Sequence, residues 1–390
     1  MEFTKSTIDE IDDSEITSSV PLPSPSPSLS ATDDDDNTTG SISIERKLDD
    51  TNPNPITLQR VFKGHKKSVT CLDHCTSNND IIASGSDDHC VRIWDTRTGK
   101  CSKCIMTNDS IDSISFSTKN DNMIYVACGN KLKLYDLRSN DVIISQDSLC
   151  LEFTSDINAI CINQKGQYLA ISDDTGSIII IDILNDHKII KRLCRVHSNL
   201  VSAISFRYSF NSNISSGGFD CTACTWDINT GRPLSSTNFS RQNIAQSTSI
   251  PMINPPFVQS IKYSFSGKVL VCGLGDGTIR LLNPRNSVTV EFVEAHGGTI
   301  TCMSTIENDH KNLIISGGID KKVKCWEILE VKERNTKNKK SAGSSYNIVP
   351  LWSIDHNEKV NAIIPMYSNT SKKVYVTDIG NNIWEYVITP

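Results

Sequence analysis

Four side chains recur in the same order, at nearly the same spacing, three times along the 390-residue chain. A histidine comes first, a serine and an aspartate follow, and a tryptophan ends the frame 29, 29 and 30 residues after the histidine. The three sets are His65, Ser84, Asp88 and Trp94; His197, Ser216, Asp220 and Trp226; and His296, Ser316, Asp320 and Trp326. Repeats of roughly 40–45 residues with this pattern are typical of one blade of a β-propeller, which consists of four antiparallel strands. The repeat therefore predicts an all-β fold.

The residues inside each unit have the pattern of short strands joined by tight turns. In the first unit, β-branched runs at 69–72, 80–84 and 91–94 are separated by clusters of Asn, Asp and Gly. Such clusters are typical of antiparallel connections. Comparable runs continue to the end of the chain and complete seven units, with Tyr135 and Ile181 in the tryptophan place of the second and third. The chain is therefore predicted to fold as a seven-bladed propeller.

The predicted propeller covers residues 56–390, with polar insertions at 240–256 and 331–347. We expect the last strand of the sixth blade at 351–355 and a histidine of the repeat type, His356, at the start of the seventh.

One predicted strand has no blade of its own. ITLQRVF at 56–62 precedes the first unit, whereas the last unit ends with NIWEYVI at 382–388 and is one strand short. Pairing these two segments would close the ring and remove the exposed sheet edges that favour aggregation.

The repeated frame resembles that of the WD-repeat family, whose fold is a propeller. The resemblance implies that the four residues of each set form a buried hydrogen-bond chain across three strands, each bond contributing about 1 kcal/mol. Similar residue types occur in catalytic triads, but here they are expected to hold a blade together. GxSxG, HExxH and P-loop motifs are absent from the sequence, so we do not expect an enzyme.

Residues 1–55 differ in composition from the rest of the chain. They hold 13 acidic and three basic residues, so they carry −10 and the remainder +4 of the net charge of −6. Low hydrophobicity with high charge predicts a disordered tail. Ser24 and Ser26 each precede a proline and are candidate phosphorylation sites, although a passive solubilising tail is the alternative. Without an apolar leader or a run of 18 apolar residues, we expect a cytoplasmic or nuclear protein with no membrane segment.

Fourteen cysteines are scattered through strand-like runs, where reduced thiols pack as small apolar side chains. Cys101 with Cys104, and Cys221 with Cys224, have metal-like spacing. Residues three apart on a strand point to opposite faces, however, and cannot easily share one zinc ion. The glycine-rich run at 273–277 leads into a strand, which argues against a phosphate loop. We expect no metal and no other cofactor, and the net acidity argues against nucleic acid as a partner.

The tetrapeptide WDTR ends at Arg97 in the first unit, and YDLR ends at Arg138 in the second. WD-repeat proteins that dock onto damaged-DNA-binding protein 1, the adaptor of cullin-4 ubiquitin ligases, often carry WDxR in neighbouring repeats. The resemblance implies four adaptor-binding residues: Asp95, Arg97, Asp136 and Arg138. An arginine here would offer its planar fork to an acceptor on the partner. The alternative is a local ion pair with the preceding aspartate, and Tyr135 departs from the tryptophan of the motif.

A closer resemblance is to the family of WD repeat-containing protein 53. It rests on residues 162–207, on the segment IDHNEKVNAI at 354–363, and on a basic insertion between the sixth and seventh blades. This resemblance implies a substrate receptor of the cullin-4 ligase that binds a protein client. The tail lies outside the resemblance.

The alternative function is an assembly platform without a ligase role, for a chromatin or signalling complex, which binds a peptide across one face of the ring. Phe219 and Ile319 each precede the structural aspartate of a turn between the second and third strands. Apolar residues at two equivalent turns are candidates for client binding. Packing of both side chains against adjacent loops is the competing interpretation.

Overall fold

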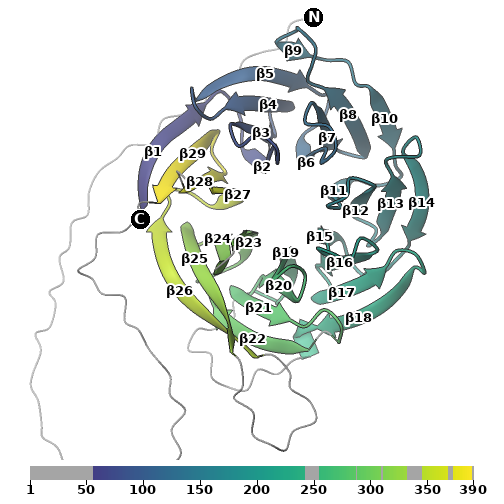
Figure 1. Ribbon diagram of the computed structural model, residues 1–390, viewed down its shortest axis with the longest axis vertical. Helices are drawn as coiled ribbons and strands as arrows, with labels where there is room; N and C mark the ends of the chain where they lie inside the picture. The colour runs from purple at the N-terminus through teal and green to yellow at the C-terminus, as the bar shows by residue number, and fades with distance from the viewer. Residues whose placement is uncertain are drawn as a thin grey trace, which may run out of the picture. The chain divides into compact units, whose positions relative to one another are not determined.

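The computed structural model describes residues 56–241, 254–286, 288–308, 311–331, 345–367 and 372–388. They form a ring of seven antiparallel sheets, as the repeat predicts (Figure 1). We call the strands of each blade a to d from the centre of the ring outwards. The predicted tail at 1–55 and most of the predicted insertions at 240–256 and 331–347 lie outside the described residues.

The first four blades follow one another along the chain. Blade one comprises β2 (Val69–His74), β3 (Ile81–Ser86), β4 (Cys90–Asp95) and β5 (Lys100–Met106). Blade two comprises β6 (Ile111–Phe116), β7 (Met123–Cys128), β8 (Lys131–Asp136) and β10 (Leu149–Glu152). Blade three comprises β11 (Ile157–Ile162), β12 (Tyr168–Asp173), β13 (Ile178–Asp182) and β14 (Lys188–Leu193). Blade four comprises β15 (Val201–Phe206), β16 (Asn213–Gly218), β17 (Thr222–Asp227) and β18 (Arg232–Asn238).

The remaining blades complete the ring after a short 3-10 helix, η1 (Phe239–Arg241). Blade five comprises β19 (Val258–Ser264), β20 (Val269–Leu274), β21 (Thr278–Leu282) and β22 (Thr289–Glu294). Blade six comprises β23 (Ile300–Asn308), β24 (Lys311–Gly318), β25 (Lys322–Val331) and β26 (Ser345–Asp355). Blade seven comprises β27 (Val360–Tyr367), β28 (Lys372–Asp378), β29 (Asn382–Ile388) and β1 (Ile56–Lys63). In the described part of the chain, no helix has the length and apolar character needed to cross a membrane.

The ring closes by pairing its two ends. β1 runs antiparallel to β29, with Ile56 opposite Ile388 and Lys63 opposite Asn382, which confirms the predicted pairing. Phe62 of β1 also packs edge-on against Trp94, with ring centroids 5.7 Å apart. The closing strand is therefore held by its ladder and by an apolar contact to blade one.

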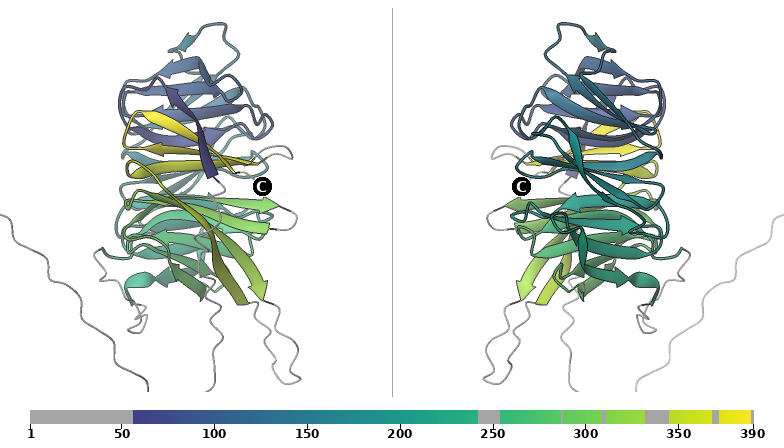
Figure 2. Two further views of the ribbon diagram at one scale, coloured as in Figure 1. Left: turned by 90° about the vertical axis from the view of Figure 1, so that its left-hand side faces the viewer. Right: turned by 90° about the vertical axis from the view of Figure 1, so that its right-hand side faces the viewer.

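Two features differ from the sequence-based expectation. β25 and β26 form a long hairpin that extends past the neighbouring blade (Figure 2), so the predicted insertion at 331–347 is shorter than expected. Tyr346 is buried in this hairpin, and its ring lies 5.2 Å from that of Phe265. The second difference is β9 (Ile143–Ile144), a fifth strand that pairs in parallel with β5.

Each inner strand has a β-bulge after its first residue, because the register with strand b shifts there in all seven blades. The bulge residues are Thr70, Asp112, Asn158, Ser202, Gln259, Thr301 and Asn361. A bulge leaves one residue outside the ladder and re-aims its side chain. Side views show the turns on two opposite faces of the ring (Figure 2). One face carries the b–c turns and the loops from d to the next a, and the other carries the a–b and c–d turns.

Candidate interaction surfaces

Arg97 and Arg138 occupy equivalent places in the c–d turns of blades one and two. Arg97 Nη2 donates to Asp95 Oδ2 at 3.1 Å, and Arg138 Nη2 donates to Asp136 Oδ2 at 2.6 Å. The local ion pairs are therefore present. The two arginine side chains nevertheless remain 69% and 65% exposed, so each fork is oriented by its aspartate while most of its surface faces solvent.

The charges at these turns are fixed over a wide pH range. Hydrogen bonds from the side chain and then the backbone N–H of Arg138 lower the pKa of Asp136 to about 2. Arg97 lowers the pKa of Asp95 in the same way. Because both groups of each pair stay ionised at neutral pH, the turns present a steady charge pattern to a partner.

The aspartate also has a structural role that is separate from the arginine. In five blades an Asp or Asn stands at the end of strand c or directly after it. Its side-chain oxygen accepts a hydrogen bond from the backbone N–H of the residue two positions further along the chain. These donors are Arg97 and Arg138 at 2.9 Å, Leu184 and Asn229 at 3.1 Å, and Arg285 at 3.0 Å. This contact stabilises a tight turn without any arginine. In blade five the acceptor is the neutral Asn283, so among these five turns only blades one and two combine a carboxylate with a guanidinium.

The loop that follows Arg138 is joined to blade one through β9. The chain after Arg138 crosses to the outer edge of blade one, where Cys104 N–H donates to Val142 O at 2.8 Å. Lys103 Nζ also donates to Ser139 O at 2.5 Å. Among the described strands, β5 is the one outermost strand that is flanked in this way (Figure 1). The c–d loop of blade two is thereby anchored on blade one.

Beside this link lie apolar side chains that the sequence analysis did not single out. Val142 is 66% exposed and Ile143 is 58% exposed. The available signal was the apolar run VII at 142–144 within an otherwise polar loop. Exposed apolar side chains that lie together can form part of a protein-binding surface. Arg285, in the tripeptide NPR at the equivalent turn of blade five, was also overlooked.

The repeated His, Ser, Asp and Trp side chains form the hydrogen-bond chain that the repeat implies. In blade one Trp94 Nε1 donates to Ser84 Oγ at 2.8 Å, and Ser84 Oγ lies 2.7 Å from His65 Nε2. His65 Nδ1 in turn lies 3.0 Å from an oxygen of Asp88. A neutral histidine protonated on Nδ1 satisfies every contact. Equivalent contacts occur among the corresponding residues of blades four and six.

Blade seven has a different version of this network. His356 Nδ1 lies 2.9 Å from the hydroxyl of Tyr386, and its Nε2 lies 3.0 Å from Asp378 Oδ2. Trp384 Nε1 also donates to Asp378 Oδ2 at 3.0 Å. Register decides this arrangement, because Tyr386 pairs with Val374 just as Trp94 pairs with Ile82. The spacing of the four residue types did not indicate it.

On the b–c face, Phe219 and Ile319 pack against adjacent loops and are still 36% and 40% exposed. The Phe219 ring lies 4.6 Å from that of Phe257. Phe257 in turn covers Gly275, where an added Cβ would lie 2.5 Å from the Phe257 ring. The two phenylalanines thus form a continuous apolar surface between blades four and five.

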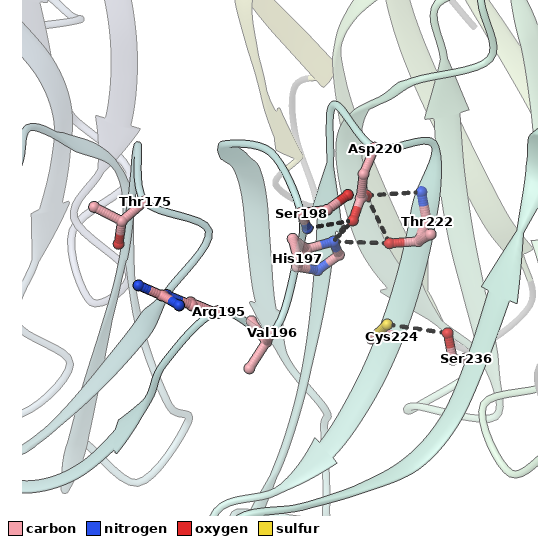
Figure 3. Close-up of a pocket in the computed structure, with 9 residues that line it drawn as sticks. All are labelled: Thr175, Arg195, Val196, His197, Ser198, Asp220, Thr222, Cys224 and Ser236. Atoms are coloured by element: carbon pink, nitrogen blue, oxygen red, sulfur yellow. Dashed lines mark hydrogen bonds and ion pairs between the residues drawn. The ribbon is translucent and has the colours of Figure 1, made fainter.

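A cleft of about 650 Å³ opens between blades three and four. Its wall includes His197 and Asp220, which already bond to each other and to Thr222, and its base holds Cys224 and Ser236 (Figure 3). Arg195, from the loop before His197, points away from His197 toward the side of Thr175 (Figure 3). Most polar atoms of this wall are engaged within the protein.

The described residues contain no group of three or more His, Cys, Asp or Glu side chains placed to hold a metal ion. The cysteines with metal-like spacing are free thiols. Burial, followed by the electrostatic effect of Cys90, raises the pKa of Cys104 to about 12.

Comparison with known proteins agrees with this geometry. The family described as "WD domain, G-beta repeat" matches residues 56–95, and the "Anaphase-promoting complex subunit 4 WD40 domain" matches residues 234–308. The WD repeat-containing protein 53 homolog of Dictyostelium discoideum is 30% identical over 82% of this chain and 91% of that protein. THO complex subunit 3 of Arabidopsis thaliana is 23% identical over 67% of this chain and 76% of that protein. The ribosome biogenesis protein BOP1 homolog of Caenorhabditis elegans is 26% identical over 31% of this chain and 22% of that protein.

Proposed function

The chain belongs to the WD repeat-containing protein 53 family of WD-repeat propellers, and on that basis we propose that it is a substrate receptor of a cullin-4 ubiquitin ligase. In this proposal it docks onto damaged-DNA-binding protein 1 and presents a client protein on the opposite face. WD-repeat propellers are protein-interaction scaffolds, and the proposal specifies which partner this scaffold binds.

The observation that carries the proposal is the pair of exposed arginine turns on adjacent blades. Arg97 and Arg138 are each oriented by a carboxylate two residues earlier, which reduces the conformational entropy lost on binding. An arginine fork can meet a carboxylate with two parallel hydrogen bonds, which a lysine cannot do. Val142 and Ile143, which are also exposed, lie against the outer edge of β5.

The test is a titration of full-length protein against purified damaged-DNA-binding protein 1. We expect the double variant Arg97→Ala/Arg138→Ala to keep the wild-type melting temperature and to bind at least about tenfold more weakly, which corresponds to about 1.4 kcal/mol. The double Arg→Lys variant should fall between the two.

Arg285→Ala is the matched control, because Arg285 has the same backbone turn but a neutral partner, Asn283. It should bind like the wild type. Undiminished binding by a folded double variant would exclude these arginines as the docking site. Failure of the wild-type protein to bind the adaptor would exclude the ligase function and leave the scaffold.

A second candidate is an assembly platform without a ligase role, which the exposed Phe219–Phe257 surface favours. It predicts that Phe219→Ser/Ile319→Ser abolishes recovery of the main protein partner, whereas Arg97→Ala/Arg138→Ala has no effect. Loss of the partner only in the arginine variant would reject this candidate.

A further inference from the structure

The b–c face carries seven equivalent positions, one in each b–c turn. At six of them the backbone N–H donates to a carbonyl of the preceding d–a loop, so they correspond in space as well as in sequence. From blade one to blade seven they are Asp87, Gly129, Asp174, Phe219, Gly275, Ile319 and Ile379. The chemistry divides the face, because the side chains are acidic in blades one and three but apolar in blades four, six and seven.

Further carboxylates join the acidic side at blade two and at the loop into blade three. Asp112 Oδ2 accepts a hydrogen bond from Gly129 N–H at 3.2 Å. Partial burial, followed by repulsion from Asp156, Asp87 and Asp174, raises the pKa of Asp112 to about 6. Three further carboxylates therefore lie near enough to Asp112 to oppose its ionisation. Asp112, Asp156 and Asp174 form no ion pair with any other described residue.

The bulge residue of blade two departs from the pattern of the other blades. In four blades the bulge side chain donates to a carbonyl of the next inner strand. These bonds join Thr70 to Ile111, Ser202 to Val258, Thr301 to Val360 and Asn361 to Val69. Asp112 takes this place in blade two, where a carboxylate cannot donate. Asn158 takes it in blade three, and its buried Nδ2 has no hydrogen-bond partner among the described residues.

We propose that the b–c face over blades two to five binds a short peptide that combines one basic and one apolar side chain. The basic side chain lies against Asp112, Asp156 and Asp174, and the apolar side chain lies on Phe219 and Phe257. This peptide is the client segment of the scaffold function proposed above, on which the assignment rests.

The two halves of this surface are contiguous. Gly176, in the b–c turn that carries Asp174, lies directly against the backbone carbonyls of His197 and Asn199. The next residue, Leu200, accepts a hydrogen bond from the backbone N–H of Phe219. An extended peptide can therefore pass from the carboxylates to the phenylalanines.

Charge selects the occupant of the surface. The clustered carboxylates repel phosphates and acidic peptides, and a cation removes the mutual repulsion that now acts at Asp112. Arg195 lines the cleft beyond Thr175 and forms no ion pair with the described carboxylates. The carboxylates of Asp112, Asp156 and Asp174 thus remain available to a cation of a partner beside the apolar surface.

The test uses full-length protein on an array of octapeptides, each with one arginine followed after one to four residues by one leucine. Matched arrays replace the arginine by glutamate or the leucine by serine. We expect the arginine–leucine peptides to be retained at least about tenfold more strongly than either control set. Asp112→Asn/Asp174→Asn should abolish the preference for arginine, and Phe219→Ser should abolish that for leucine. Circular dichroism melting checks that each variant folds.

The adaptor-docking variant Arg97→Ala/Arg138→Ala should select peptides like the wild type. The experiment therefore distinguishes failure of the peptide-binding proposal from failure of the adaptor-docking proposal. Retention should also weaken from about pH 7.5 to about pH 5.5 as Asp112 takes up a proton, and Asp112→Asn should remove most of that dependence. Equal retention of the glutamate peptides, or an unchanged preference in the folded aspartate variant, would overturn the proposal.

Discussion

Blade four and blade two share the same four-stranded register but have different interiors. In blade four, Trp226 donates to Ser216, which bonds in turn to His197. In blade two, Tyr135 occupies the tryptophan place, and Val126 stands where the serine would be, opposite Lys133 as Ser84 is opposite Arg92. Tyr135 is fully buried, yet its hydroxyl has no hydrogen-bond partner among the described residues.

The difference shows which interactions define a blade. Blade two keeps its strands in place through the ladder and through an apolar cluster that includes Ile111, Val126 and Tyr135. The hydrogen-bond chain therefore adds stability to a blade without being needed for its fold. At the c–d turns, blade two rather than blade four carries the additional polar feature. Blade four presents the neutral Asn229, whereas blade two presents Arg138 and continues into β9.

The largest expected effect is on the interior of blade four. Trp226→Ala should lower the free energy of unfolding by about 3–5 kcal/mol, because it leaves a cavity and removes a donor from Ser216. Arg138→Ala in blade two should leave it unchanged within error, since that side chain is mostly exposed. Urea denaturation of both variants measures the difference. Equal losses would mean that the tryptophan chain is not part of the stabilising core.

Acid should weaken blade four more than blade two. Burial opposes ionisation of Asp220, but hydrogen bonds from His197 and Thr222 outweigh it and lower the pKa to about 2. Because folding lowers the pKa of this carboxyl, its ionised form stabilises the folded protein. This contribution to the free energy of unfolding is complete above the pKa of the unfolded state, near 4, and is lost as the pH falls from about 4 towards about 2. We expect Asp220 to contribute about 1–2 kcal/mol in this way.

Unfolding measured from about pH 6 to about pH 2.5 tests this expectation. Asp220→Asn should reduce the decrease in the free energy of unfolding that acid causes. Asp136→Asn is the control in blade two, because its carboxyl is also held at a low pKa but in a solvent-exposed turn. An identical acid profile for Asp220→Asn and wild type would contradict the stabilising role of the buried pair.

The sequence predicted the parts of the molecule that repeat. The spacing of the repeats predicted the seven blades and the pairing of 56–62 with 382–388. Each blade of a propeller has the same local structure, and the ring must close so that no sheet edge is left exposed. The substitution of Tyr386 for tryptophan in blade seven was not predictable, since it depends on a register that several sequence alignments allow.

The candidate surfaces were predicted less completely, because they combine residues that are distant along the chain. The arginine turns were visible as a motif, but the attachment of the Arg138 loop to blade one depends on a parallel pairing between Cys104 and Ile143. Likewise, the acidic side of the b–c face brings Asp87, Asp112 and Asp174 from three blades to one place. No local pattern encodes such an arrangement.

The smallest expected effect comes from the buried hydroxyl of blade two. Tyr135→Phe should raise the free energy of unfolding by about 0.5–1 kcal/mol, because it removes a buried polar group that the fold leaves unpaired. Burial, which opposes ionisation, raises the pKa of Tyr135 to about 12. The positive charge of Lys133 opposes this rise in the pKa, and the Lys133 ammonium pairs with Asp147 at 3.3 Å.

Urea denaturation of Tyr135→Phe beside Tyr263→Phe distinguishes an unpaired hydroxyl from a paired one. Tyr263 is also buried, but its hydroxyl lies 2.6 Å from that of Ser215, so removing it should destabilise the protein by about 1 kcal/mol. Opposite signs for the two substitutions are the expected result. A loss of stability in both would mean that the Tyr135 hydroxyl has a hydrogen-bond partner in solution, such as a buried water. Both blades would then have a buried polar network, and they would differ only in the groups that form its hydrogen bonds.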